Sequence, residues 1–176
     1  LALGKIQDVI YDSTRISWTT NVLNAAKKNE IIPLDKIGEN SNCLYRPYFK
    51  QYGCYSRFWN ERVYQLPKLF PTSKYKNLVI CVSGVGVTKD FSCIITDMLP
   101  DLELIGKSQC FPLYWYEENK NKQQTLSLFD TESSDDYIRR DGITDWILKE
   151  VRTRFGNARK ITKETIFYYV YGLLHS

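Results

Sequence analysis

The sequence predicts an α+β fold in which a small mixed central sheet is flanked by N-terminal and C-terminal helices. Three short apolar runs predict the sheet, at residues 77–82, 91–96 and 110–116, because short runs rich in β-branched and aromatic side chains are typical of buried strands. Segments with helical spacing near both ends predict the helices. With 176 residues and 43% hydrophobic content, the chain can bury one good core.

The first part of the chain, residues 1–42, is expected to be a helical lead-in. The apolar positions of residues 19–28 fit a short helix, and Pro33 prevents this helix from running on, because proline lacks a backbone N–H and clashes with the preceding turn. Residues 43–75 are dense in Tyr, Phe, Trp, Arg and Lys without helical spacing. This composition favours short strands and loops with projecting aromatic side chains.

The main core is expected within residues 43–140. Gly84 and Gly86 predict a turn between two strands, because a dinucleotide-binding loop needs a third glycine and a helix directly behind it. Residues 117–136 are mostly polar and are expected to form a mobile connection. The residues expected in the core include Val79, Ile80, Ile94 and Leu113.

The last part, residues 141–176, is expected to be a pair of helices. Thr144 or Asp141 can cap a first helix that ends at Gly156, and a second helix starts after Thr162. We expect this last helix to leave part of its apolar face exposed. The side chains expected there are Tyr168, Tyr171 and Leu174.

Known catalytic patterns find no match in the sequence. The five cysteines lack the close spacing of zinc ligands, so neither zinc nor disulfides are expected, and Cys81 is interpreted as a small buried hydrophobic residue. Residues 100–107 hold the residue types of a metal-dependent nuclease, but such centres draw their acids from different strands. His175 is interpreted as structural, and an adenine-methyltransferase Asn/Asp-Pro-Pro-aromatic tetrad is absent. We expect no catalytic residue, metal or cofactor site here.

The distribution of charge is more informative than the net charge of +4. Residues 43–90 contain eight Lys or Arg and two acids, a local charge of +6, whereas residues 91–145 contain eleven acids and five bases, a local charge of −6. Guanidinium groups beside planar rings suit phosphate contacts and hydrogen bonds to base edges. The candidate DNA-binding residues are Arg46, Lys50, Arg57 and Arg62, followed by Lys68, Lys74, Lys76 and Lys89.

Composition alone leaves two interpretations of this basic segment equally open, namely a DNA-binding surface and a solvated face over an aromatic core. Two other functional classes also stay open, a docking or spacer domain inside a larger enzyme and a catalytic nuclease or methyltransferase piece. Incubation with DNA, Mg²⁺ and S-adenosylmethionine would identify the catalytic piece, and salt-dependent DNA binding would separate recognition from docking. No apolar run is long enough for a membrane span, so a soluble, cytoplasmic protein is expected.

A family resemblance favours DNA recognition. Six segments occur in order over nearly the whole chain and resemble the C-terminal region of the single-polypeptide type I-like (type ISP) restriction-modification enzymes. Phe111-Pro112-Leu113-Tyr114 and the Phe167–Tyr171 string are the more specific of them, and Tyr48 stands where the family usually has Phe. The six segments are Ile16–Trp18, Leu44–Tyr48, Asn60–Tyr64, Asn77–Ile80, Cys110–Tyr114 and Ile166–Tyr171.

The resemblance implies a target-recognition module cut from a longer polypeptide. In that family one chain carries a nuclease, a translocating ATPase, an N6-adenine methyltransferase and then this module, so S-adenosylmethionine, ATP and Mg²⁺ are expected in the parent enzyme and not here. The expected partners are double-stranded DNA and the adjacent methyltransferase domain, to which the module would present an adenine for base flipping.

Overall fold

The computed structural model describes residues 18–31, 38–56, 60, 62–120, 136–156 and 160–176. These residues form short helices and short strands, which confirms the predicted α+β fold. In chain order the elements are α1 (Thr20–Lys27), β1 (Glu39–Arg46), β2 (Phe49–Tyr55), α2 (Leu66–Leu69), β3 (Val79–Val82), β4 (Cys93–Thr96), β5 (Leu99–Pro100), β6 (Gln109–Pro112), β7 (Tyr114–Glu118), β8 (Tyr137–Asp141), α3 (Asp145–Phe155) and α4 (Lys163–Leu173).

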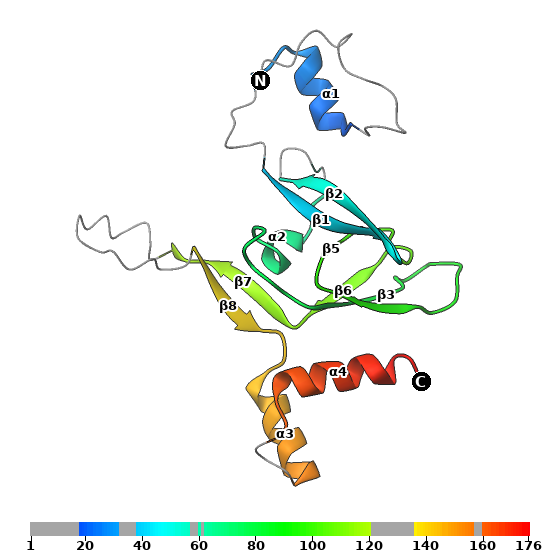
Figure 1. Cartoon of the computed structure of the whole chain (residues 1–176), viewed down its shortest axis with the longest axis vertical. Helices are drawn as coiled ribbons and strands as arrows, with labels where there is room; N and C mark the ends of the chain where they lie inside the picture. Colours follow the sequence, from blue (N-terminus) through cyan, green and yellow to red (C-terminus); the bar gives the residue numbers. More distant parts are fainter. Residues whose placement is uncertain (1–17, 32–37, 57–59, 61, 121–135, 157–159) are drawn as a thin grey trace, which may run out of the picture.

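The described strands form three small sheets, with orders β4-β3-β6, β2-β1-β5 and β7-β8 (Figure 1). The first is the central sheet that the three apolar runs predicted. Its pairs are all antiparallel, so the prediction of a mixed central sheet was wrong in this detail. The parallel pairing is found instead in the second sheet, between β1 and β5.

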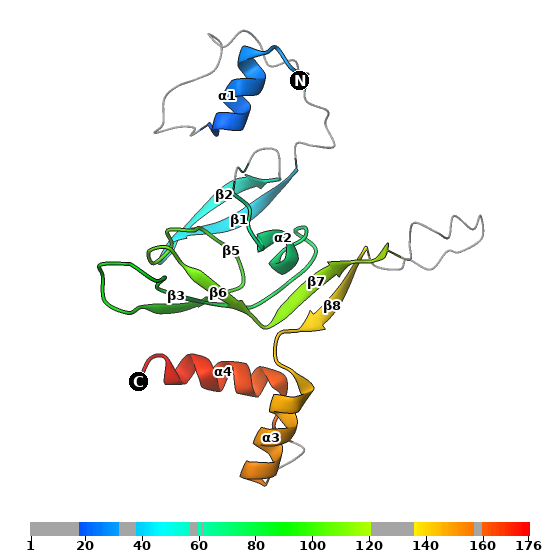
Figure 2. The same cartoon turned by 180° about the vertical axis from the view of Figure 1, so that it is seen from behind.

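Successive side chains of a strand point to opposite faces of the sheet. The apolar strands of the central sheet therefore present apolar side chains on both faces, and each face packs against another element. Val79 and Cys81 belong to a cluster with Leu44 of β1 and the buried Leu69 and Leu104. The opposite face contributes to a second cluster that includes side chains from α4. The central sheet therefore lies between the β2-β1-β5 sheet on one side and α4 on the other, as both views show (Figures 1 and 2). The second cluster contains Ile80, Val82, Leu113 and Phe167, with Tyr171 and Leu174 packed against it.

Three of the four predicted core residues, Val79, Ile80 and Leu113, are buried. Ile94 is half-buried instead, because β4 is an edge strand of its sheet. The predicted strand 110–116 divides at Leu113 into β6 and β7, which belong to different sheets. Leu113 donates its backbone N–H to the Leu78 carbonyl at 2.7 Å, so it acts as a buried pivot between the two strands.

The side chain of Asn77 joins three elements near this pivot. Its amide nitrogen donates to the backbone oxygens of Leu69, at the end of α2, and of Tyr114, in β7, at 2.9 and 2.6 Å. Its amide oxygen accepts from the backbone N–H groups of Leu78 and Tyr114 at 2.8 and 3.0 Å. Asn77 is only 4% exposed, so all four bonds are shielded from water and fix β7 relative to β3.

At the N-terminal end the predicted short helix is present as α1, with the Thr19 hydroxyl accepting from the Val22 N–H as an N-cap. β1 begins at Glu39, however, so the strand starts inside the segment 1–42 that was predicted to be helical. Figures 1 and 2 place α1 beyond the β1–β2 hairpin and away from the central sheet. The N-terminal helix therefore does not flank the central sheet as predicted.

Both C-terminal helices begin at predicted positions, and the first also ends at the predicted glycine. Thr144 caps α3, which stops at Gly156 in the left-handed conformation with φ 66°. Thr162 forms a capping box with Thr165 at the start of α4, a local arrangement that satisfies backbone N–H groups the helix leaves free. α3 has no buried residue, whereas α4 buries Ile166 and Phe167.

The exposed side of α4 differs from the prediction. Tyr168 is exposed as expected, but Tyr171 and Leu174 pack against the second core cluster, so their assignment to an exposed face was wrong. Tyr169 and Leu173 are exposed instead. The face of α4 that carries Phe167 packs against the sheet, so the residues on the opposite face are exposed.

The first two residues of the segment 117–136, predicted to be a mobile connection, form part of a strand instead, because Glu117 and Glu118 belong to β7 and pair with β8. The central part of this segment, residues 121–135, lies outside the described residues. The predicted glycine turn is confirmed between β3 and β4, where Gly86 has a φ of 79°. No helix in the described part of the chain is both long enough and apolar enough to span a membrane.

Candidate nucleic-acid interface

The β1–β2 hairpin lies in the predicted basic segment and carries strongly exposed side chains. Its strands pair antiparallel from Glu39 opposite Tyr55 to Arg46 opposite Phe49, with an irregularity in register near the tip. The two-residue turn is Pro47-Tyr48, and Tyr48 has a φ of 67°. A non-glycine residue in this region is uncommon and carries some backbone strain. The strained turn directs the tip outwards without contributing to either core cluster.

Large aromatic side chains on this hairpin are strongly exposed. Tyr48 is 96% exposed, Tyr52 is 85% exposed and Phe49 is 57% exposed. Lys50, which lies between Phe49 and Tyr52 in sequence, is also exposed. Several neighbouring exposed aromatic residues on one ribbon indicate a contact surface, because folding alone would favour burying them.

Arg46, the first-ranked candidate, is held in place by its surroundings. Its guanidinium lies 4.0 Å from the centre of the Tyr45 ring, donates to the Tyr45 backbone oxygen at 2.7 Å and to the Tyr45 hydroxyl at 3.3 Å. It also forms an ion pair with Asp101 at 3.2 Å. Both charged side chains are partly exposed, so the pair itself stabilises the fold by at most about 1 kcal/mol. Its main effect is to fix the direction of the guanidinium.

Residues 100–107 contain the residue types of a metal-dependent nuclease centre, but their acidic side chains have a structural role. One Asp101 carboxylate oxygen accepts from Arg46 and from the Glu103 N–H at 2.8 Å, and Glu103 accepts from the Lys107 N–H at 3.3 Å. The Asp101 N–H donates to the Leu44 carbonyl at 3.0 Å. These acids therefore hold a local turn beside the hairpin and are engaged with backbone groups.

Residues 101–107 are bonded both to the tip of the hairpin, residues 45–50, and to the β3–β4 loop, residues 83–92, and we call the three segments together the hairpin end. Arg46 joins the tip to residues 101–107 through Asp101, and Gly84 joins the loop to them through its N–H bond to the Gly106 carbonyl at 3.0 Å. A Cβ at Gly84 would collide with the Lys107 carbonyl. Both views place the tip and the β3–β4 loop on the same side of the molecule (Figures 1 and 2).

The structure divides the eight predicted cations between several places. Arg46, Lys50 and Lys89 lie in the segments of the hairpin end, and Lys89 is exposed in the β3–β4 loop. Lys74 follows Ser73, which contacts Glu39 at the base of the hairpin. The others lie away from the tip or cannot be placed: Lys68 is on α2, the Lys76 carbonyl accepts from Tyr116 of β7, Arg62 is exposed ahead of α2, and Arg57 lies outside the described residues.

The candidate DNA-binding residues predicted from the sequence were all cations. The prediction omitted Tyr48, Phe49 and Tyr52, although a Pro-aromatic pair between two aromatic-rich runs is a signal for an exposed turn. It also omitted two arginines of β8 that lie in the acidic part of the sequence. Arg139 lies 4.4 Å from the centre of the Tyr114 ring, and Arg140 pairs with Glu117 at 3.0 Å.

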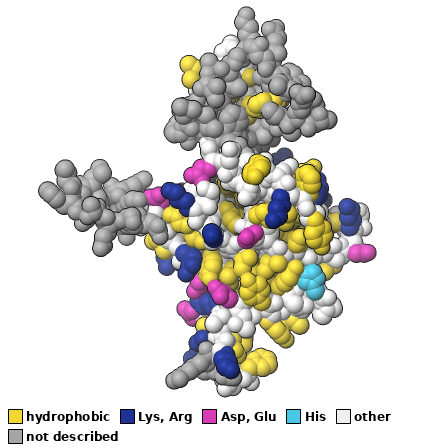
Figure 3. Space-filling view, in the orientation of Figure 1, with side chains coloured by type: hydrophobic (Ala, Val, Ile, Leu, Met, Phe, Trp, Pro, Cys, Tyr) yellow, Lys and Arg dark blue, Asp and Glu magenta, His cyan; other side chains and the backbone are white. Residues whose placement is uncertain are grey.

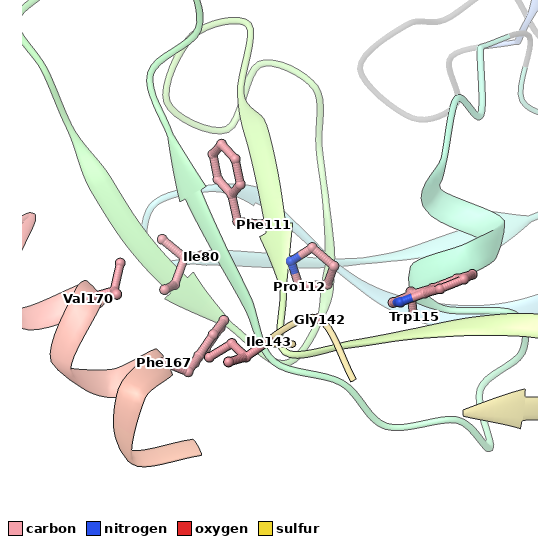
Figure 4. Close-up of a pocket in the computed structure, with 8 residues that line it drawn as sticks. All are labelled: Ile80, Phe111, Pro112, Trp115, Gly142, Ile143, Phe167 and Val170. Atoms are coloured by element: carbon pink, nitrogen blue, oxygen red, sulfur yellow. The ribbon is translucent and has the colours of Figure 1, made fainter. Parts of the chain in front are cut away.

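A second surface is apolar. An open hollow of about 420 Å³ lies between β6 and α4, and all eight lining residues are apolar or glycine (Figure 4). Figure 3 shows hydrophobic side chains gathered over the lower half of the central body, with Lys and Arg in separate spots around them. The hollow offers no titratable group, so its lining suits an apolar contact. The lining residues are Ile80, Phe111, Pro112, Trp115, Gly142, Ile143, Phe167 and Val170.

In the described part of the chain, no group of three or more His, Cys, Asp or Glu side chains has the arrangement of a metal site. Cys81 is fully buried, as predicted, and its sulfur lies 3.6 Å from that of Cys110.

Sequence comparison identifies the family. The model of the family described as "Type ISP C-terminal specificity domain" matches residues 2–176. The chain belongs to this family. The specificity domain accounts for nearly the whole sequence, and the predicted resemblance to type ISP enzymes is thereby confirmed. No curated protein sequence matched the chain significantly.

Three solved structures of much longer chains are similar to this specificity domain. LlaBIII, an ATP-dependent Type ISP restriction-modification enzyme bound to DNA, is 32% identical over 92% of this chain, with a TM-score of 0.66. The DrdV–DNA complex is 32% identical over 91% of this chain, with a TM-score of 0.67. A nuclease-deletion mutant of LlaGI with a DNA substrate mimic is 29% identical over 96%, with a TM-score of 0.59. The specificity domain spans only 10–14% of these three chains.

Proposed function

We propose that this specificity domain reads a short double-stranded DNA sequence with its β1–β2 hairpin and takes no part in catalysis itself. The observation that carries the proposal is the exposed tip, where Tyr48, Phe49, Lys50 and Tyr52 project from a two-stranded ribbon. A ribbon of this kind fits the major groove of B-DNA, which is about 12 Å wide and presents a distinct pattern for each base pair. The DNA complexes of LlaBIII, DrdV and LlaGI support a DNA ligand.

The side chains at the tip have complementary tasks in this proposal. Lys50 can donate to a guanine edge or a phosphate, Phe49 can contact a thymine methyl group, and the tyrosine hydroxyls can donate and accept. Arg46 is already oriented by Tyr45 and Asp101, so it loses little freedom when it binds a phosphate or a base. Lys89 would contact phosphate from the neighbouring loop. Arg62, Lys68, Lys74 and Lys76 would contact phosphate outside the tip, and Arg57, which lies outside the described residues, stays a candidate from the sequence.

The chemistry would be performed by other parts of a longer polypeptide. An adenine held in the site that this domain reads would be flipped into an N6-adenine methyltransferase domain, which would bind S-adenosylmethionine, while ATP and Mg²⁺ would serve the translocating and nuclease parts. The DNA substrate places such an enzyme in the cytoplasm. The resemblance to the type ISP enzymes LlaBIII and LlaGI supports this arrangement, since the domain covers a small share of those chains.

A docking function is favoured by a separate observation. Trp146 and Phe155 of α3 and Tyr169 and Leu173 of α4 are exposed, and the apolar hollow opens beside α4 (Figure 4). Exposed apolar surface of this kind is typical of contacts with another domain. We propose that the α3–α4 side rests against the methyltransferase part while the hairpin end faces DNA, so both functions use different surfaces of one domain.

Site selection from randomised duplex DNA tests the reading function. The purified domain should enrich a shared motif, and Tyr48→Ala combined with Lys50→Ala should abolish or alter that motif. The matched control is Tyr168→Ala combined with Lys149→Ala, which removes an exposed tyrosine and lysine from α4 and α3. If no motif is enriched, or if the hairpin variant selects the motif of the wild type, the hairpin does not read DNA.

A further inference from the structure

The central sheet contains a pair of thiols that the DNA-reading proposal does not use. Cys81 of β3 and Cys110 of β6 are direct partners in the antiparallel register, with 3.6 Å between their sulfurs. They are 29 residues apart in sequence, so the fold and not the local chain brings them together.

The position of Cys81 and Cys110 in the β-ladder sets their Cα atoms at a distance that a disulfide can span. Leu113 donates its N–H to the Leu78 carbonyl at 2.7 Å, and in the register of β3 and β6 these residues stand opposite each other. Hydrogen-bonded and non-bonded pairs alternate along an antiparallel ladder. Cys81 and Cys110, three positions further, therefore form a non-hydrogen-bonded pair, in which Cα atoms lie about 4.5 Å apart. Disulfides span Cα distances of about 4.4–6.8 Å.

Pro112 supports this assignment independently. It stands opposite Val79, which the same alternation makes a non-hydrogen-bonded position, where a residue without a backbone N–H costs nothing. The third cysteine of the sheet cannot compete for Cys81. Cys93 pairs with Val82 and packs against the cluster that contains α4, whereas Cys81 and Cys110 share the opposite face.

We propose that Cys81 and Cys110 are a cross-strand dithiol that a peroxide oxidises to an intramolecular disulfide in the folded domain. Cys110, the more accessible of the two, attacks as thiolate one peroxide oxygen and becomes a sulfenic acid while hydroxide leaves. The Cys81 sulfur then attacks the Cys110 sulfur, the S–S bond forms and water leaves. In sum, two thiols and one hydrogen peroxide give one disulfide and two waters.

The surroundings of the two thiols agree with Cys110 as the residue that reacts first and Cys81 as the residue that forms the disulfide. The hydrogen bond from Cys81 lowers the pKa of Cys110, because it stabilises the Cys110 thiolate. The same contact, together with burial, raises the pKa of Cys81. The thiolate is the reactive form, so Cys110 reacts first and Cys81 resolves the sulfenic acid.

Peptide mapping after oxidation tests the proposal. The chain is treated with hydrogen peroxide in native buffer, free thiols are blocked with N-ethylmaleimide, and the protein is digested without reductant for mass spectrometry. The expected product is a linked pair of peptides containing Cys81 and Cys110, lacking two hydrogen atoms and separated by dithiothreitol. The same treatment in urea should give mixed pairings, because only the fold selects this pair.

Two variants make the outcome decisive. Cys93→Ser should leave the linked pair unchanged, and Cys110→Ser should abolish it and leave Cys81 as a free thiol. If Cys110→Ser does not fold, the Cys93→Ser variant and the wild type still carry the test. The proposal is overturned if, in the folded protein, Cys110 proceeds to sulfinic acid with Cys81 unlinked, or if either cysteine pairs with another one. Neither result would alter the DNA-reading proposal.

Discussion

Replacing Asn77 by Asp should destabilise the domain strongly at neutral pH, and the loss should shrink as the pH falls. The substitution keeps the shape and both acceptor bonds, but it removes the two donor bonds to the carbonyls of Leu69 and Tyr114. Two such bonds contribute about 1–3 kcal/mol net. A carboxylate would also face two carbonyl oxygens at a buried position, and a buried charge with no cation as partner raises the total cost to about 3–5 kcal/mol.

The pH dependence follows from the same geometry. Burial and the two carbonyls raise the folded-state pKa of the introduced carboxyl group above its unfolded value of about 3.9. Its protonated form can donate one of the lost bonds. The free energy of unfolding of the Asn77→Asp variant is therefore closest to the wild-type value at acidic pH. It falls further below the wild-type value as the pH rises through the raised folded-state pKa.

Thermal unfolding monitored by circular dichroism measures this effect. For a chain of this size, 3–5 kcal/mol corresponds to a fall in the midpoint of about 6–20 °C at pH 7. Asn42→Asp, at an exposed position of β1, is the control and should change the midpoint little. A free energy of unfolding of Asn77→Asp within about 1 kcal/mol of the wild-type value at pH 7, or a deficit that is equally large at acidic pH, would show that no charge is buried at this position.

Three further substitutions have expected outcomes of their own. Gly142→Ala should cost about 1–3 kcal/mol in urea unfolding, because the new Cβ would meet a β6 backbone carbonyl, whereas Gly172→Ala, which meets nothing within 4 Å, should be neutral or stabilising. Thr162→Ala should cost about 1 kcal/mol by removing the capping box of α4, and an unchanged unfolding midpoint would contradict this. The side-chain and backbone hydrogen bonds from Ser73 lower the pKa of Glu39, so this contribution to stability exists above the unfolded pKa and disappears as the pH falls through the lowered one. Ser73→Ala should therefore raise the pKa of Glu39 in an NMR titration, and an unshifted value would exclude the contact.

The sequence predicted those elements whose signals are local. The caps at Thr144 and Thr162 and the stop at Gly156 depend on neighbouring residues only. The three strands of the central sheet are short apolar runs that must be buried wherever they lie. For these elements hydrophobic pattern and turn chemistry agree with the final fold.

Other features depend on contacts between distant residues and had no local signal. The division of the run 110–116 at Leu113 follows from bonds to Leu78 and Asn77, more than thirty positions earlier in the chain. The hairpin end is assembled in the same way, because Arg46 meets Asp101 across 55 positions. The sequence could therefore indicate a basic, aromatic segment, but not which of its cations share a surface.

The salt dependence of DNA binding tests the central claim, that the hairpin end contacts DNA. Fluorescence anisotropy with labelled duplex DNA should show log affinity falling linearly with log salt, with a slope of about −0.9 per phosphate contact. If Arg46, Lys50 and Lys89 each contact a phosphate, changing all three to Ala should flatten the slope by about 2.7. The matched control changes Lys149, Arg154 and Lys160, exposed in or just after α3, and should retain the wild-type slope. Folding of both variants is verified by circular dichroism. A correctly folded hairpin variant that binds DNA with the wild-type affinity and slope would contradict the claim.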